Sequence, residues 1–233
     1  VAVGWRMLEE DFMSFLAGTF TDLKFRIGWG QLGNQAIGDY RYEKFYFLST
    51  NDATYQFGDT YYNMIRPTGV DPNIRWETTT TTNIGFDFGI MENRISGTLD
   101  YYNKNTTDLL ADVAPPAFTN VSDVVTTNIA EMNNTGIELG LNIVAMDKTD
   151  FDWNINFNTA WNKNKIVKLD RGGEDSPGLQ RGGISGDVGQ TIKIWKPGEA
   201  FDAFYTYVRD PNGVSSSGEK YEDVNKDGQI NED

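Results

Sequence analysis

The chain has 233 residues and a formal net charge of −14, and it contains no Cys and no His. The absence of thiol and imidazole side chains excludes cysteine nucleophiles, histidine bases and zinc sites built from these ligands, so we expect no enzyme and no certain cofactor. The negative charge disfavours a phosphate backbone as a ligand, so nucleic acid is not an expected partner. Aromatic residues make up 13% of the chain and stand beside 24 Gly, a composition typical of strands and turns.

Five segments alternate between apolar and polar residues with a period of two, which is the pattern of a β-strand with one apolar face. They run through residues 23–30, 84–90, 95–102, 137–143 and 153–162. In the first, Leu23, Phe25, Ile27 and Trp29 alternate with Lys24, Arg26, Gly28 and Gly30. Each strand is therefore expected to present an apolar face and a polar face.

The connections between these segments alternate between short and long. Tight turns are predicted around Glu92-Asn93 and around residues 147–149, whereas the other connections are long. Compact soluble domains rarely carry long structureless loops, but outer-membrane barrels have short turns on one rim and long loops on the other. The loop lengths favour a transmembrane barrel, with the apolar face toward lipid.

The alternation and the turns predict strands at about 1–6, 22–30, 80–91, 94–104, 135–146 and 151–163, with outer loops at about 31–79, 105–134 and 164–233. Residues 7–16 are predicted to form a short helical turn, and residues 40–48 to contain extended backbone within the first outer loop. The whole chain is thus expected to be part of one all-β, antiparallel transmembrane β-barrel domain, with short periplasmic turns and long extracellular loops.

A soluble all-β glycan-binding or adhesion module is the alternative, because the apolar faces of two sheets can also meet in a sandwich. One feature discriminates between the two. The apolar residues Trp153, Ile155 and Phe157 oppose a nearly pure row of Asn, whereas soluble exteriors usually carry more Lys and Glu.

Several short phrases occur in a characteristic order along the chain. They are Gly4-Trp5-Arg6, Leu23-Lys24-Phe25-Arg26, Gly28-Trp29-Gly30-Gln31-Leu32-Gly33-Asn34-Gln35, Ile74-Arg75-Trp76-Glu77-Thr78-Thr79, Asn83-Ile84-Gly85-Phe86-Asp87, Asp100-Tyr101-Tyr102, Asn134-Thr135-Gly136-Ile137-Glu138, Phe157-Asn158, Trp161-Asn162-Lys163-Asn164-Lys165, Pro197-Gly198-Glu199, Phe204-Tyr205 and Asp223-Val224-Asn225-Lys226-Asp227-Gly228. No single phrase is specific, but their order over nearly the whole chain resembles the SusC/RagA-type TonB-dependent transporters.

The resemblance implies a 22-stranded barrel in the bacterial cell outer membrane, plugged by an N-terminal domain and surrounded by the lipid bilayer. It also implies a SusD/RagB-like surface lipoprotein as a lid, the TonB complex acting through the plug, and import of an oligosaccharide or peptide substrate. This chain corresponds to about a quarter of the family's length, with the plug absent, so it is expected to supply barrel wall and extracellular loops. A passive porin shares these wall features, and the sequence does not separate the two.

One motif near the end of the chain matches the opening of an EF-hand loop, with oxygen ligands at alternate positions followed by a Gly. Its candidate ligands for a structural Ca²⁺ are Asp223, Asn225, Asp227, Gln229 and Asn231. The twelfth position of the loop, normally a bidentate acid, lies one residue beyond Asp233. The alternative is that Asn and Asp only supply turn conformations here.

Aromatic residues are frequent in the first predicted outer loop, and those expected to contact a substrate or partner are Tyr40, Tyr42, Tyr46, Tyr61 and Tyr62. Packing within the loop and at the membrane interface is the alternative role for such residues. The charged residues Lys24, Arg26, Asp87, Asp100 and Glu138 fall on the polar face. There they are expected to pair with other charges inside the barrel.

Overall fold

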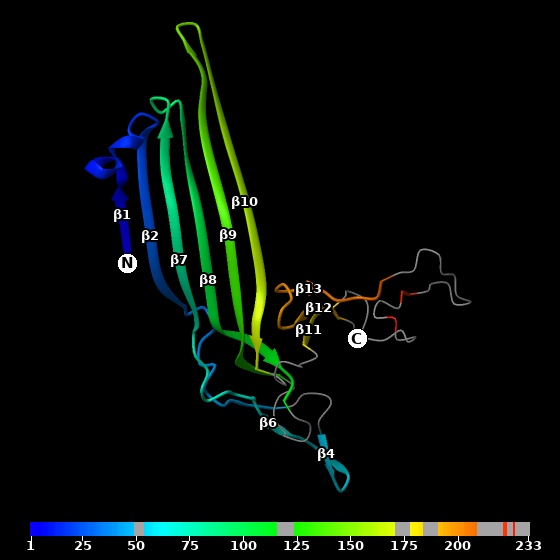
Figure 1. Ribbon diagram of the computed structural model, residues 1–233. Helices are drawn as coiled ribbons and strands as arrows, with labels where there is room; N and C mark the ends of the chain where they lie inside the picture. The colour runs from blue at the N-terminus through cyan, green and yellow to red at the C-terminus, as the bar shows by residue number, and fades with distance from the viewer. Residues whose placement is uncertain are drawn as a thin grey trace.

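The computed structural model of the chain describes residues 1–48, 54–115, 124–170, 178–183, 191–208, 221–222 and 226. Most of them form an antiparallel sheet of six strands, five of them long, in the order β1-β2-β7-β8-β9-β10 (Figure 1). The strands are β1 (Ala2–Arg6), β2 (Phe20–Asn34), β7 (Glu77–Ile90), β8 (Ile95–Val113), β9 (Val125–Lys148) and β10 (Phe151–Leu169). The expected all-β, antiparallel architecture is therefore confirmed.

The strand register joins the apolar residues of neighbouring strands into one continuous apolar face. One row across the sheet consists of Ile27, Ile84, Tyr101, Ile137 and Trp161. Residues that pair directly across strands point to the same side of a sheet, so the alternation within each strand becomes a surface. Four of these five side chains are exposed, Trp161 by 63%, and Ile84 is partly buried.

The apolar face has a defined height along the strands. On β7 its first and last rows are marked by Ile84 and Ile90, which are six residues apart and therefore about 20 Å apart at a rise of ~3.3 Å per residue. Toward the loops the next row is polar on β7 to β10, with Thr82, Asn103, Thr135 and Lys163 in register, and its member on β2 is Trp29. With the side chains included, this height agrees with the ~25 Å apolar band of a membrane barrel.

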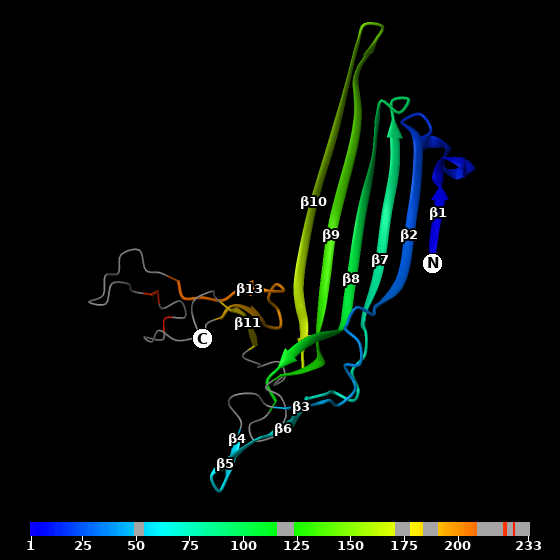
Figure 2. The same cartoon turned by 180° about the vertical axis from the view of Figure 1, so that it is seen from behind.

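The two ends of the sheet differ in the length of their connections (Figures 1 and 2). At one end β7 and β8 are joined by a tight turn in which Met91, Glu92 and Asn93 have positive φ, and β9 and β10 are joined through residues 149–150. Both predicted turns are confirmed. At the same end the 3-10 helices η1 (Met7–Glu9) and η2 (Asp11–Leu16) join β1 to β2, which confirms the predicted helical turn.

The strands extend much further toward the loop end than the sequence predicted. The outer loop predicted at 105–134 is wrong, because β8 continues to Val113 and β9 begins at Val125. Polar residues in these extensions interrupt the alternation of apolar and polar side chains from which strands are predicted. The extensions are nevertheless paired through backbone hydrogen bonds and through side-chain bonds such as Thr79 Oγ1 to Thr106 Oγ1 at 2.9 Å. Strand β10 likewise continues beyond residue 163, to Leu169.

Short strands occupy the remaining loops. In the first loop β3 (Tyr46–Leu48) pairs with β6 (Ile65–Pro67), and β4 (Thr54–Phe57) pairs with β5 (Thr60–Asn63). Of the extended backbone predicted at 40–48, only the last three residues form a strand. After β10 a three-stranded sheet contains β11 (Leu179–Gly183), β12 (Thr191–Trp195) and β13 (Ala203–Phe204).

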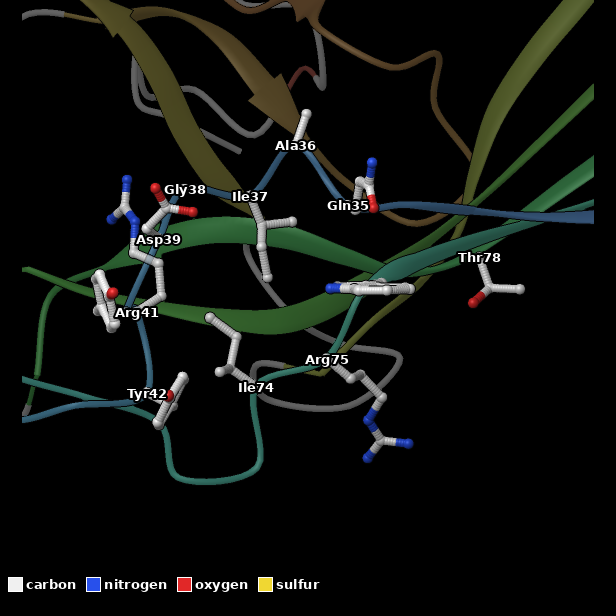
Figure 3. A pocket seen from close by; sticks show the side chains of 12 residues that line it. Gln35, Ala36, Ile37, Gly38, Asp39, Arg41, Tyr42, Ile74, Arg75 and Thr78 are labelled. Atoms are coloured by element: carbon white, nitrogen blue, oxygen red, sulfur yellow. The ribbon is translucent and has the colours of Figure 1, made fainter.

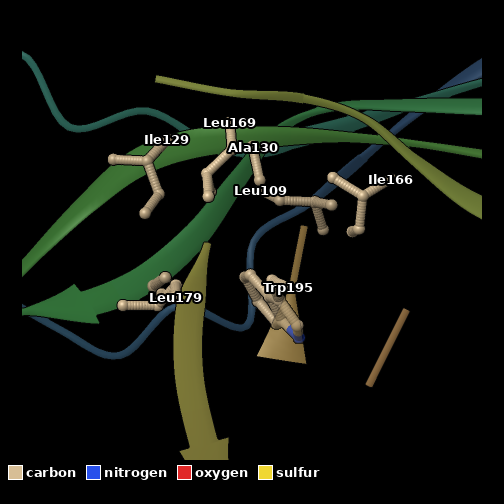
Figure 4. Close-up of a cluster of buried hydrophobic side chains, with 8 residues drawn as sticks. Leu109, Ile129, Ala130, Ile166, Leu169, Leu179 and Trp195 are labelled. Carbon is tan, nitrogen blue, oxygen red and sulfur yellow. The ribbon is translucent and has the colours of Figure 1, made fainter. Parts of the chain in front are cut away.

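The buried apolar cluster lies at the loop end of the large sheet, where β11 and β12 pack against β8, β9 and β10 (Figure 4). Its members are Leu109, Ala111, Ile129, Ala130, Ile166, Leu169, Leu179 and Trp195. A soluble sandwich would place a second sheet over the apolar face, and no described residue supplies one. Within the described part of the chain there is no helix with the length and apolar character needed to span a membrane.

Candidate functional site

The polar face carries a charged bridge across three neighbouring strands. Arg26 on β2 donates from Nε to both carboxylate oxygens of Asp87 on β7, at 2.9 and 3.0 Å. Its Nη2 donates to Oδ2 of Asp100 on β8 at 3.1 Å. The three side chains are between 18% and 31% exposed, so solvent only partly screens the bridge. The predicted pairing of polar-face charges is observed for these three residues.

The bridge passes over Gly85, which lies between Arg26 and Asp100 in the strand register. A Cβ at this position would come within 2.8 Å of Arg26 Nη2 and would collide with Asp100 Oδ1. Glycine therefore leaves the space that the guanidinium and the carboxylate occupy. The same face is shaped at Gly136, where a Cβ would collide with the Tyr102 ring.

The sheet β11–β13 is attached to the polar side of the loop end. Asn164 and Ile166 continue the polar-face row of β10, and Asn164 Oδ1 accepts a hydrogen bond from the Phe201 backbone N at 2.7 Å. The backbone of Ile166 pairs with the segment before β13, donating to Glu199 O at 2.8 Å and accepting from Gly198 N at 2.9 Å. The described part of the chain after β10 thus lies against the polar side of the large sheet.

A polar network inside this covering sheet holds its strands together. Trp195 Nε1 donates to Asp202 Oδ1 at 2.6 Å, and Lys193 Nζ donates to Asp202 Oδ2 at 3.0 Å. Burial alone would raise the pKa of the Asp202 carboxyl, but these hydrogen bonds and the charges of Lys193 and Arg181 hold that pKa below its usual value. The charged Asp202 carboxylate therefore accepts hydrogen bonds from two side chains of β12.

An open cavity of about 960 Å³ lies where the first outer loop meets the loop end of β7 (Figure 3). It is lined by residues 35–42, 74–76 and 78. Figure 3 shows Ile37 and Ile74 pointing toward one another from the two segments. The lining also contains two tyrosines, a tryptophan, an aspartate and two arginines: Tyr40, Tyr42, Trp76, Asp39, Arg41 and Arg75.

The two segments that form this cavity are tied to the extended part of β9. Asn128 clamps one of them, because its Oδ1 accepts from Arg75 N at 2.9 Å while its Nδ2 donates to Arg75 O at 2.9 Å. Arg41 Nη1 donates to Thr126 Oγ1 at 3.2 Å and holds the other segment. The cavity therefore depends on strand residues that the sequence had assigned to a loop.

Two of the five predicted contact tyrosines, Tyr40 and Tyr42, line the cavity. Tyr46 lies on β3, and Tyr61 and Tyr62 lie on β5; all three are exposed and none belongs to the cavity lining. Sequence reasoning did not select Trp76, although it belongs to one of the phrases that carried the family resemblance.

The predicted calcium ligands Asp223, Asn225, Asp227, Gln229 and Asn231 lie outside the described residues. Within the described residues, His, Cys, Asp and Glu form no group of three with the spacing of a metal site. The calcium loop therefore stays a prediction from the sequence.

Comparison with known proteins gives consistent matches over nearly the whole chain. The family model "TonB dependent receptor-like, beta-barrel" matches residues 17–229. The chain is 38% identical over 240 residues to the TonB-dependent receptor SusC of Bacteroides thetaiotaomicron, a match that covers 95% of this chain and 24% of that protein. It is 34% identical over 248 residues to the TonB-dependent receptor P26 of Formosa agariphila, covering 100% of this chain and 24% of the relative.

Solved structures share the fold. A structure of the RagAB peptide transporter matches with a TM-score of 0.69 at 22% identity, over 95% of this chain and 24% of that one. A RagAB peptide importer in the "closed-closed" state matches with a TM-score of 0.68 at 23% identity and the same coverage. The chain spans about a quarter of the length of the relatives it matches. Because the family model covers residues 17–229, the chain belongs to the TonB-dependent receptor β-barrels, as a partial barrel of the SusC/RagA type.

Proposed function

We propose that this chain forms part of the wall and outer loops of an importer in the bacterial outer membrane. The observation that carries the proposal is the two-sided sheet: one face is a band of exposed apolar side chains, and the other carries the partly buried bridge of Arg26, Asp87 and Asp100. Charged side chains in a membrane protein belong on the side of a wall that meets water or protein. The apolar face thus meets lipid and the polar face lines the lumen.

The partners follow from the family to which the chain belongs. In the intact protein a plug fills the lumen against the polar face, and the TonB complex acts through that plug. A SusD/RagB-like lipoprotein covers the outer loops. Family membership and the position of β11–β13 on the lumen side of the loop end support this arrangement.

The substrate class is an oligosaccharide or a peptide, and the cavity beside β7 is one of its contact sites. Tyr42 and Trp76 provide aromatic faces on which a sugar ring or a peptide side chain can stack. Arg41 and Asp39 supply one cation and one anion for polar groups of the ligand. The residues 223–231 are proposed to hold a structural Ca²⁺ that stiffens the last outer loop, without a catalytic role.

The experiment is a growth test with the full-length protein in its own cells. Deletion of its gene should abolish growth when one class, oligosaccharides or peptides, is the sole nutrient source, while growth on a free monosaccharide or amino acids is kept. Wild-type protein restores growth, and a plug-deleted variant does not. Growth of the deletion strain on every oligosaccharide and peptide mixture would contradict import as the function.

A further inference from the structure

The connection between β1 and β2 exposes large apolar side chains at the turn end of the sheet. Phe12 is 66% exposed and Phe15 is 74% exposed, and both belong to η2. In Figure 1 the segment stands beside the end of β1, at the end of the sheet opposite the cavity and the loops. Six of the ten residues 7–16 are apolar, and most of the Phe12 and Phe15 side-chain surface is left uncovered by the described residues.

The segment is attached to the apolar face of the wall, not to its polar face. Trp5 pairs with Phe25 in the register of β1 and β2, which places its side chain on the apolar face. The Phe12 ring lies with its centroid 6.1 Å from that of Trp5, with a tilt of 30°. The contact is held by Trp5 Nε1, which donates to Glu10 Oε1 at 3.1 Å. Phe12 of η2 therefore lies against the apolar face, beside Trp5.

The composition of the segment suits the boundary between lipid and water. Aromatic residues are favoured at this boundary, and short amphipathic segments lie in its plane with their apolar side toward the acyl chains. The acidic residues Glu9, Glu10 and Asp11 are exposed and remain in contact with water. A plug in the lumen would meet the opposite, polar face, so it does not cover this surface.

We propose that residues 7–16 form an interfacial anchor, with Phe12 and Phe15 inserted among the lipids of the leaflet at the turn end of the barrel. The proposal rests on the proposed function, because it requires the apolar face to meet lipid. The anchor supports the turn end of β1 and β2 against the membrane surface. Its occupant is a phospholipid surface, recognised by apolar burial.

The test measures fluorescence quenching of a label on the full-length protein reconstituted in phospholipid vesicles. This chain contains no Cys, so a single Cys can be labelled once any Cys elsewhere in the protein is replaced by Ser. The positions are Phe15→Cys in the anchor, Phe157→Cys in the middle of the apolar face and Asn158→Cys beside it on the polar face. Quenchers are lipids brominated near the headgroup, lipids brominated deep in the acyl chain, and aqueous iodide.

We expect the label at Phe15 to lose more emission with shallow than with deep bromine, and the label at Phe157 to show the reverse order. If Phe157 is quenched by lipid but Phe15 only by iodide, the anchor is in water and this proposal is overturned while the barrel placement stands. Protection of Phe15 from all three quenchers would show a protein cover and would also overturn it. Absence of lipid quenching at Phe157 would instead contradict the proposed function itself.

Discussion

Gly85 and Asp100 are direct partners in the register of β7 and β8, and the Asp100 carboxylate occupies the space that a side chain at Gly85 would fill. Arg26 approaches the same space from β2. A charged bridge across three strands thus depends on one residue that has no side chain. Each charge sits on a different strand, so the bridge ties β2, β7 and β8 together on the face away from lipid.

The substitution Gly85→Ala should destabilise the wall, because the added methyl group must displace Asp100 or Arg26. We expect a loss of about 0.5–1.5 kcal/mol in the free energy of unfolding, because the displaced groups are the ends of flexible side chains and the cost is that of weakened hydrogen bonds in the bridge. The measurement is denaturant unfolding of the full-length protein in detergent. Gly28→Ala is the matched control, since Gly28 is also on the polar face and has no atom within 4 Å of the added Cβ. Equal stability of the two variants would contradict the steric argument.

Removal of the central cation should lower the free energy of unfolding more than removal of the whole bridge. Arg26→Met leaves Asp87 and Asp100 facing each other without a counter-charge, and we expect a loss of about 1–2 kcal/mol because the groups are partly exposed. The triple variant Arg26→Met, Asp87→Asn and Asp100→Asn should recover part of that loss, since it leaves no unpaired charge. Denaturant unfolding of both variants checks the order. A triple variant less stable than Arg26→Met would show that the carboxylates stabilise the protein through groups other than Arg26.

The sheet β11–β13 should loosen in acid. The folded pKa of Asp202 is below its usual value, so its contribution is fully present above the unfolded pKa of about 3.9 and is lost as the pH falls through the lower folded pKa. Hydrogen-exchange protection of the β12 amides, corrected for the intrinsic pH dependence of exchange, measures this loss.

The variant Asp202→Asn is the control for this titration. Asp202 has a φ of 57°, a conformation that Asn tolerates well, so the backbone should be kept while the charge is removed. Protection in this variant should be lower at neutral pH and should not fall further in acid. A variant with the acid sensitivity of the wild type would assign the titration to another group.

Substrate affinity should fall when an aromatic side chain is removed from the cavity. We expect Tyr42→Ala and Trp76→Ala each to weaken binding of the imported ligand by about 2- to 10-fold, the range given by aromatic contacts of 0.5–1.5 kcal/mol. Calorimetry with the ligand class found in the growth test measures this. Tyr61→Ala is the control, because Tyr61 is equally exposed but lies on β5 outside the cavity. An equal loss of affinity in all three variants would show that the cavity is not part of the binding site.

Calcium should bind to the full-length protein through residues 223–231. We expect a dissociation constant of about 10⁻⁴–10⁻³ M, as in extracellular calcium modules, and loss of this binding in Asp223→Ala and Asp227→Ala. Calcium titration by calorimetry provides the measurement. Asp59→Ala removes an acid from another outer loop and should leave the affinity unchanged. Binding that survives both Asp223→Ala and Asp227→Ala would leave the motif with the role of a turn.

The amino-acid sequence by itself determined the middle of the wall. Apolar residues at every second position, such as Ile84, Phe86 and Phe88, predicted the strands, and the two tight turns predicted the pairing of β7 with β8 and of β9 with β10. A local period is readable without knowledge of the partner strands, because each strand faces the same two environments. The order of short phrases further indicated the family, which the family model and SusC confirm.

Only the tertiary structure decided the loop end. Thr126 and Asn128 belong to a strand there because they pair with β8. Their side chains also bind Arg41 and Arg75 from a distant loop, and no local period predicts such contacts. The cavity likewise unites residues 35–42 with 74–76, which are adjacent in space but separated in the chain by the strands β3 to β6. The bridge from Arg26 to Asp100 depends on register, since a shift of one residue in β7 would place a side chain under it. The alternation is a property of neighbouring residues in the sequence, whereas these contacts form only when the strands pair in the correct register.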